Sequence, residues 1–155
     1  MRRLISCTAA LVFALGVNIA IAGNRTYVNP RFGTTITFPN AIFTTVEPDA
    51  ANGDGRKWTA PDGATLTVWG QNNVLDFTPE SIADFVSKEI GDVTYRKVGS
   101  KWMVVSGLHD GLIVYHRAEF GSGGVIHSME LSYRTDVRQH YDRLAGIIAD
   151  SLIGP

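Results

Sequence analysis

The chain contains a single cysteine, Cys7, which lies ahead of most of an amino-terminal apolar run. If these first residues are removed, no cysteine remains to form a disulfide, a thiolate nucleophile or a metal ligand. The sequence also lacks a G-x-S-x-G elbow, an H-E-x-x-H pair and a glycine-rich phosphate loop. The sequence therefore gives no evidence for the classes of enzyme that these short motifs identify.

The sequence also lacks an excess of basic or acidic residues. The chain has 14 basic and 15 acidic residues, for a formal net charge of −1. Proteins that bind nucleic acids normally carry a basic excess that displaces counterions, so no nucleic-acid partner is expected. The long apolar run occurs once, at the amino terminus, so no membrane span is expected after its removal.

That run has the features of a secretory signal peptide. Arg2 and Arg3 form its positive start, residues 4–19 are largely apolar, and an Ala-Ile-Ala cleavage pattern precedes Gly23. A membrane anchor is the alternative, but the run is short and lacks a basic stop-transfer flank. The sequence therefore predicts a signal peptide at residues 1–22, a periplasmic or secreted product, and a single domain at residues 23–155.

Hydrophobic periodicity and turn residues predict the elements of this domain. Residues 23–30 are expected to form a loose lead, and Pro61-Asp62-Gly63 is expected to close a hairpin. One helix should begin after Thr78 and end at Gly91, and a second should span residues 137–152 behind an Asp136–Gln139 capping box. Strands are predicted at residues 34–38, 56–60, 64–71, 93–98, 101–109, 112–120 and 125–133.

The last four strands predict a sheet that is apolar on both faces. If residues 121–124 form a four-residue loop, one face carries Met103, Val105, Leu112, Val114, Phe120, Val125, Met129 and Leu131. The other face then carries Trp102, Val104, Leu108, Ile113, Tyr115 and Ile126. Both faces need a cover, which the two helices can supply. The predicted fold class is α+β, an antiparallel sheet with helices on both faces in an α/β/α sandwich.

The order of these elements resembles the PsbP-like fold. The opening RFGTTITFP contributes Phe32-Gly33, Phe38 and Pro39 to this resemblance, which extends over most of residues 23–155. PsbP of photosystem II, the exported DcrB proteins and a family of Ran-binding proteins share this fold. Members act as binding or accessory subunits, so the resemblance implies a PsbP-like or DcrB-like exported domain without catalytic activity. It implies no photosynthetic role, and no residue here matches an ion site of PsbP.

Residues 48–63, PDAANGDGRKWTAPDG, are dense in acidic, amide and glycine residues. Such residues suit a calcium loop or a series of tight turns. In an alignment on Asp54, Asn52 fits the calcium-loop pattern, but an alanine and a proline occupy two principal ligand positions. We therefore favour turns in which Asn52 and Asp54 bond nearby backbone. A cation site built from Asp49, Asp54 and Asp62 is the alternative.

Two strand histidines form the other polar candidate. His116 and His127 are each followed three residues later by a glutamate, which a strand places on the opposite face. With a four-residue loop, the two histidines are diagonal neighbours on one face. A zinc site needs a third ligand, and Glu119 and Glu130 point away. We therefore expect neutral, hydrogen-bonded histidines and no metal.

Two functional classes follow from these observations. The first is a non-catalytic binding or accessory module that contacts another envelope protein through a sheet edge or an exposed hairpin. The second is a hydrolase or metal-dependent enzyme whose site is assembled from distant residues. The absence of a local nucleophile, acid and base cluster favours the first class, without catalytic residues and without a cofactor. Candidate ligand or partner residues are His116, His127, Asn52, Asp54 and Asp62.

Overall fold

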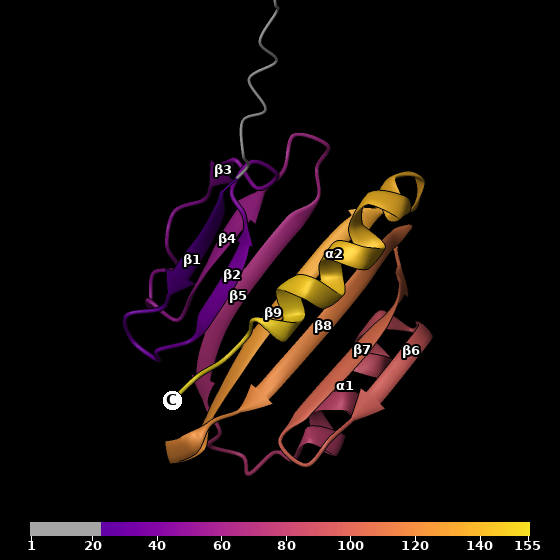
Figure 1. Ribbon diagram of the computed structural model, residues 1–155. Helices are drawn as coiled ribbons and strands as arrows, with labels where there is room; N and C mark the ends of the chain where they lie inside the picture. Colours follow the sequence, from indigo (N-terminus) through magenta and orange to yellow (C-terminus); the bar gives the residue numbers. More distant parts are fainter. Residues whose placement is uncertain (1–22) are drawn as a thin grey trace, which may run out of the picture.

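The computed structural model describes residues 23–155, and the predicted signal peptide lies outside them. A seven-stranded antiparallel sheet with the order β3-β4-β5-β9-β8-β7-β6 is its main element (Figure 1). A second sheet pairs β1 with β2. The strands are β1 (Asn24–Val28), β2 (Thr35–Pro39), β3 (Thr45–Val46), β4 (Gly55–Thr59), β5 (Thr65–Asn72), β6 (Asp92–Val98), β7 (Trp102–His109), β8 (Leu112–Phe120) and β9 (Val125–Arg134).

Strand β1 corrects the prediction of a loose lead at residues 23–30. It pairs along its whole length with β2. Tyr27 points inward, and its ring meets the ring of Trp58 edge-on at a centroid distance of 4.9 Å. The remaining β1 side chains are exposed or half-buried, so the strand carries one inward aromatic residue rather than a clear alternation. Pairing and this aromatic contact hold the segment in place.

The first helix agrees with its prediction. Helix α1 (Pro79–Ile90) begins after Thr78, whose hydroxyl accepts a hydrogen bond from the Ser81 amide, and Gly91 caps its carboxyl end.

Helix α2 (Arg138–Asp150) begins one residue later than predicted, after the short 3-10 helix η2 (Thr135–Val137). The predicted Asp136–Gln139 capping box does not form. The Asp136 carboxylate instead pairs with Arg134, which competes for the same oxygens.

The register of β8 and β9 differs by one residue from the prediction. Phe120 pairs with Ile126, so five residues separate the paired positions instead of four. The connection contains the 3-10 turn η1 (Ser122–Gly124), in which Gly123 and Gly124 adopt φ values of 69° and 70°. Val125 is used to close this turn, because its carbonyl accepts from the Gly121 amide at 2.9 Å. The shift moves every β9 side chain to the face opposite the predicted one.

Two hydrophobic cores result from this register. The core with α1 contains Ala83, Val86, Ile90, Met103, Val105, Val114, Ala118 and Ile126. The core with α2 is larger and includes Ile36, Phe38, Phe43, Trp58, Leu66, Val68, Met129, Leu131, Tyr133, Tyr141 and Ile148. Figure 1 shows α2 lying across β8 and β9, and α1 beside β6 and β7. The α+β class with a large antiparallel sheet and two helices is confirmed. Neither helix within residues 23–155 has the length and apolarity needed to cross a bilayer.

Candidate functional site

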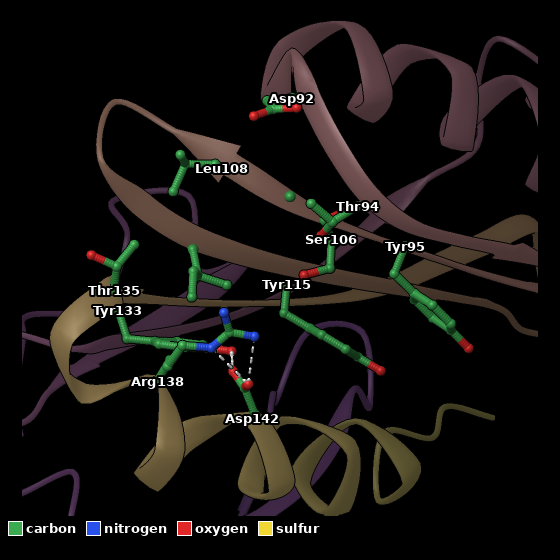
Figure 2. Close-up of a pocket in the computed structure, with 12 residues that line it drawn as sticks. Asp92, Thr94, Tyr95, Ser106, Leu108, Tyr115, Tyr133, Thr135, Arg138 and Asp142 are labelled. Atoms are coloured by element: carbon green, nitrogen blue, oxygen red, sulfur yellow. Dashed lines mark hydrogen bonds and ion pairs between the residues drawn. The ribbon is translucent and has the colours of Figure 1, made fainter.

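A cavity of about 440 Å³ lies between α2 and the end of the sheet that carries β6 (Figure 2). Strands β6, β7 and β8 form its floor, and the amino-terminal half of α2 forms one wall. We call this cavity the α2 groove. It is lined by Asp92, Thr94, Tyr95, Ser106, Gly107, Leu108, Ile113, Tyr115, Tyr133, Thr135, Arg138 and Asp142.

A β-bulge in β6 helps to build the groove. The register of β6 on β7 shifts between Val93 and Tyr95. Asp92 therefore pairs with Leu108 and Tyr95 pairs with Ser106, so that all four side chains share one face. On a regular strand, residues three apart would face opposite sides. The bulge thus brings an acidic and an aromatic side chain of the edge strand into one cavity.

A polar cluster occupies the α2 side of the groove. The Arg138 guanidinium pairs with the Asp142 carboxylate at 3.1 Å, one helical turn away. The other oxygen of that carboxylate accepts a hydrogen bond from the Tyr133 hydroxyl at 2.9 Å. Burial, together with the bond to Asp142, raises the pKa of Tyr133 far above its ordinary value. The phenol therefore remains a donor, and the three side chains form a hydrogen-bonded wall of the groove (Figure 2).

Cations and an aromatic ring meet farther along the same sheet face. The Trp102 ring has Lys97 at 5.7 Å and Arg117 at 5.0 Å from its centroid. Arg117 is held by the Glu119 carboxylate and lies 3.7 Å from Asp150 at the end of α2. Among residues 23–155, no acidic side chain pairs with Lys97, which lies over the ring. This leaves a cationic position on the groove side of β6.

A second cavity, of about 250 Å³, lies where the carboxyl-terminal segment crosses β8 and β9. We call it the His127 cavity. It is lined by Arg117, Glu119, Phe120, Gly121, His127, Asp150, Leu152, Ile153 and Gly154. Arg117 and Tyr115 are two residues apart on β8 and share a face, so the two cavities follow one another along that face.

His127 is fully buried in this second cavity. Its Nδ1 lies 2.8 Å from the Thr34 hydroxyl, and its Nε2 has no hydrogen-bond partner within residues 23–155. Burial lowers the pKa of the imidazole, so the ring is neutral. Within residues 23–155, the Thr34 hydroxyl has no other acceptor, so we assign it as the donor to Nδ1. The proton of the neutral ring is then on Nε2.

Two glycines make room for this arrangement. Gly70 pairs with His127 across β5 and β9. A Cβ at Gly70 would lie 2.5 Å from the Phe32 side chain and 2.6 Å from the Thr34 hydroxyl, so glycine lets that loop reach the imidazole. A Cβ at Gly154 would lie 2.0 Å from Nε2 of His127. The carboxyl-terminal segment therefore covers the ring at a distance that only glycine permits.

The two candidate histidines are not brought together. His116 pairs with Glu130 and His127 pairs with Glu119, and the one-residue register shift separates the two rings onto opposite faces. His116 Nδ1 lies 3.5 Å from the Glu130 carboxylate, and its ring meets Trp69 edge-on at 5.3 Å. The predicted diagonal neighbourhood is therefore wrong. The prediction failed because the turn includes Val125 and so is one residue longer than assumed.

The acidic candidates take part in local hydrogen bonds. The Asn52 side-chain amide donates to the Asp54 carboxylate at 2.6 Å, and the Asp54 backbone N–H donates to Oδ1 of Asn52 at 3.3 Å. Asp62 accepts from the Tyr141 hydroxyl at 2.9 and 3.0 Å. Asp49 pairs with the arginine of β4. Within residues 23–155, no three histidine, cysteine, aspartate or glutamate side chains form a metal-sized cluster.

Neither cavity combines a histidine, a carboxylate and a serine in its lining. The α2 groove has Ser106 and carboxylates, and the His127 cavity has a histidine and carboxylates. Sequence reasoning missed the groove because three strands and a helix from distant parts of the chain build it. The exposed Tyr95 could have indicated the groove. It lies among charged residues on an edge strand, where an aromatic side chain does not pack into a core.

The fold has a close match among solved structures. The solution structure of cyanobacterial PsbP (CyanoP) from Synechocystis sp. PCC 6803 superposes with a TM-score of 0.60, at 14% identity, over 98% of this chain and 99% of that chain. The chain has a PsbP-like fold. At this identity the PsbP likeness shows the fold alone, and it confirms the fold predicted from the order of elements. No family model and no curated protein matches the sequence.

Proposed function

We propose that this chain is an exported, periplasmic or secreted protein that acts as a non-catalytic binding or accessory module for another envelope protein. The α2 groove is the observation that carries the proposal. Export rests on the signal-peptide pattern of residues 1–22. The PsbP-like fold supports an accessory role, because the resemblance described above implies one.

The groove has the chemistry of a protein-binding surface. Tyrosine and arginine, which contribute most to protein interfaces, line it together with aliphatic side chains. Tyr95 is 49% exposed and Leu108 is 37% exposed, so binding can remove apolar area of both side chains from water. The lining holds a serine and two carboxylates, but it holds no histidine or lysine that would activate the serine and no cysteine. This composition favours binding over the alternative of a hydrolase or metal-dependent enzyme.

The proposal includes the layered arrangement in which the sheet lies between the two helices. Ile126 belongs to the α1 core, whereas Met129 and Leu131 belong to the α2 core. Ile126 is three and five positions from the other two residues along β9, and these odd separations support a helix on each face. In such an arrangement α1 stiffens the floor of the groove from behind, and α2 forms its wall.

Site-specific photo-crosslinking in cells that export the chain tests this proposal. A benzophenone side chain replaces Tyr115 on the groove floor or Val46 on β3, at the opposite end of the sheet. Val46 is 42% exposed and serves as the matched surface control. We expect one discrete protein adduct from position 115 and none from position 46. Equal adducts from both positions, or none from position 115, would contradict a binding role for the groove.

A further inference from the structure

Strand β6 is a long sheet edge next to the groove. The sheet ends in β6 on one side and in β3 on the other. Strand β6 has seven residues, whereas β3 has two. An edge strand presents backbone N–H and C=O groups that no neighbouring strand satisfies, so it can pair with another extended chain.

The groove opens directly onto this edge. Asp92 and Tyr95 line the groove, and Lys97 continues the same face, because these residues pair with Leu108, Ser106 and Val104 of β7. An extended chain added to β6 would therefore place alternate side chains over the groove. A helix docked there would leave the edge groups of β6 unpaired, since its own backbone bonds are internal.

Charges along the edge define what such a chain must carry. Arg96 faces the α1 side, where Glu80 and Asp84 hold it at 2.6 and 2.9 Å. Lys97 faces the groove side and lies over an aromatic ring. Asp92 stands at the other end of the strand. An incoming segment is complementary if it places an acidic residue near Lys97 and a basic residue near Asp92.

The same edge is protected against indiscriminate pairing. The bulge between Val93 and Tyr95 twists it, and Lys97 places a charge on it. Both devices are ones by which proteins prevent association between exposed sheet edges. A flat, apolar strand is therefore a poor partner for β6. A segment that matches the bulge and the charges remains able to pair.

We propose that β6 accepts an extended segment of the partner protein as an eighth strand of the sheet. Apolar side chains of this segment enter the α2 groove beside Tyr95, and an acidic side chain pairs with Lys97. The inference rests on the proposed function, because it describes how the partner occupies the groove. Main-chain hydrogen bonds to β6 supply affinity, and the groove and the charges supply selectivity.

The spacing of crosslinks tests this geometry. Benzophenone side chains are placed one at a time at Asp92, Tyr95 and Lys97, and mass spectrometry locates the partner residue that each one captures. Successive positions are about 7 Å apart, since they lie opposite every second residue of β7. We expect the captured residues to follow one another in steps of about two along the partner sequence. A helical segment would give steps of about four to five, because a helix rises 1.5 Å per residue.

Steps of four to five residues, or three captures of the same partner residue, would overturn the strand-addition inference while the binding function still held. Absence of adducts at these positions and at Tyr115 would instead overturn both proposals. Charge reversal supplies a second readout. The Lys97→Glu change should reduce the adduct from Tyr115 at least fivefold, whereas Lys101→Glu in the neighbouring turn should leave it within twofold. Equal yields of the Tyr115 adduct from the two variants would show that Lys97 does not pair with the partner.

Discussion

His127 shows how one buried side chain can set the response of this fold to pH. The imidazole is completely buried, and within residues 23–155 its one hydrogen bond is with the Thr34 hydroxyl. Arg117, Glu119 and Asp150 line the same cavity, and burial lowers the pKa of the ring. Protonation of Nδ1 would remove the acceptor of the Thr34 hydroxyl and would leave a charged ring whose Nε2–H has no acceptor within residues 23–155. Folding therefore favours the neutral ring.

The free energy of unfolding should consequently decrease as the pH falls below about 6.5, the ordinary value for histidine. The unfolded chain takes up a proton there, and the folded chain resists it, so stability is highest above that pH. One such group gives a slope of up to about 1.4 kcal/mol per pH unit. Urea denaturation between pH 7.5 and 5.5 measures the slope.

A His127→Gln variant is the control for this experiment, because an amide at this position does not titrate. Its stability should change less than that of the wild-type protein over the same pH range. Parallel curves for the two proteins would show that another group is responsible.

At the scale of elements, one hydrogen-bonded contact joins the first large hairpin to α2. Asp62, in the turn between β4 and β5, accepts from the buried Tyr141 hydroxyl and from the Ala64 amide at 3.0 Å. Burial, followed by the bond to Asp62, raises the pKa of Tyr141 well above its ordinary value. The acidic turn that resembles part of a calcium loop thus contributes a helix-docking contact.

A Tyr141→Phe change should therefore lower the free energy of unfolding by about 1–2 kcal/mol, since a hydrogen bond to a carboxylate is lost. The same change made in an Asp62→Ala background should cost only a few tenths of a kcal/mol. Chemical denaturation of the two single variants and the double variant gives this coupling. Additive losses would mean that the two side chains do not interact.

Element-level features differ in how far the sequence determines them. Helix α1 was predictable because Thr78, Pro79 and Gly91 give local signals at its two ends. The β8–β9 register was not, because a run of glycines permits a turn of either length, and residues distant in sequence, Asn73 and Pro155, help to hold the observed turn through hydrogen bonds with Gly124 and Ser122. The Asp136 cap failed for a similar reason, since Arg134 takes its carboxylate.

At the scale of the whole molecule, the sequence predicted the fold better than the site. The order of elements indicated the PsbP-like fold. That order could be predicted because the hydrophobic periodicity and the turn residues of each segment define its helix or strand locally. The α2 groove depends on a bulge in β6, on the placement of α2 and on strand order, none of which leaves a local motif. None of the five candidate residues lines the α2 groove. His127 lines the His127 cavity, and Asp54 lines a further cavity of about 270 Å³ beside β4 and β5.

A measurement of native size tests the central claim, that the chain is exported and binds another protein, most directly. Leu108 in the groove and Val46 on β3 are 37% and 42% exposed, so an arginine at either position should leave the core intact. Native size measurement of the exported fraction should show the wild-type chain and Val46→Arg in an assembly with a second protein. It should show Leu108→Arg as the free chain, with an unchanged melting temperature and an amino terminus at Gly23. An assembly that survives Leu108→Arg, or a wild-type chain without a partner, would contradict the proposed binding module.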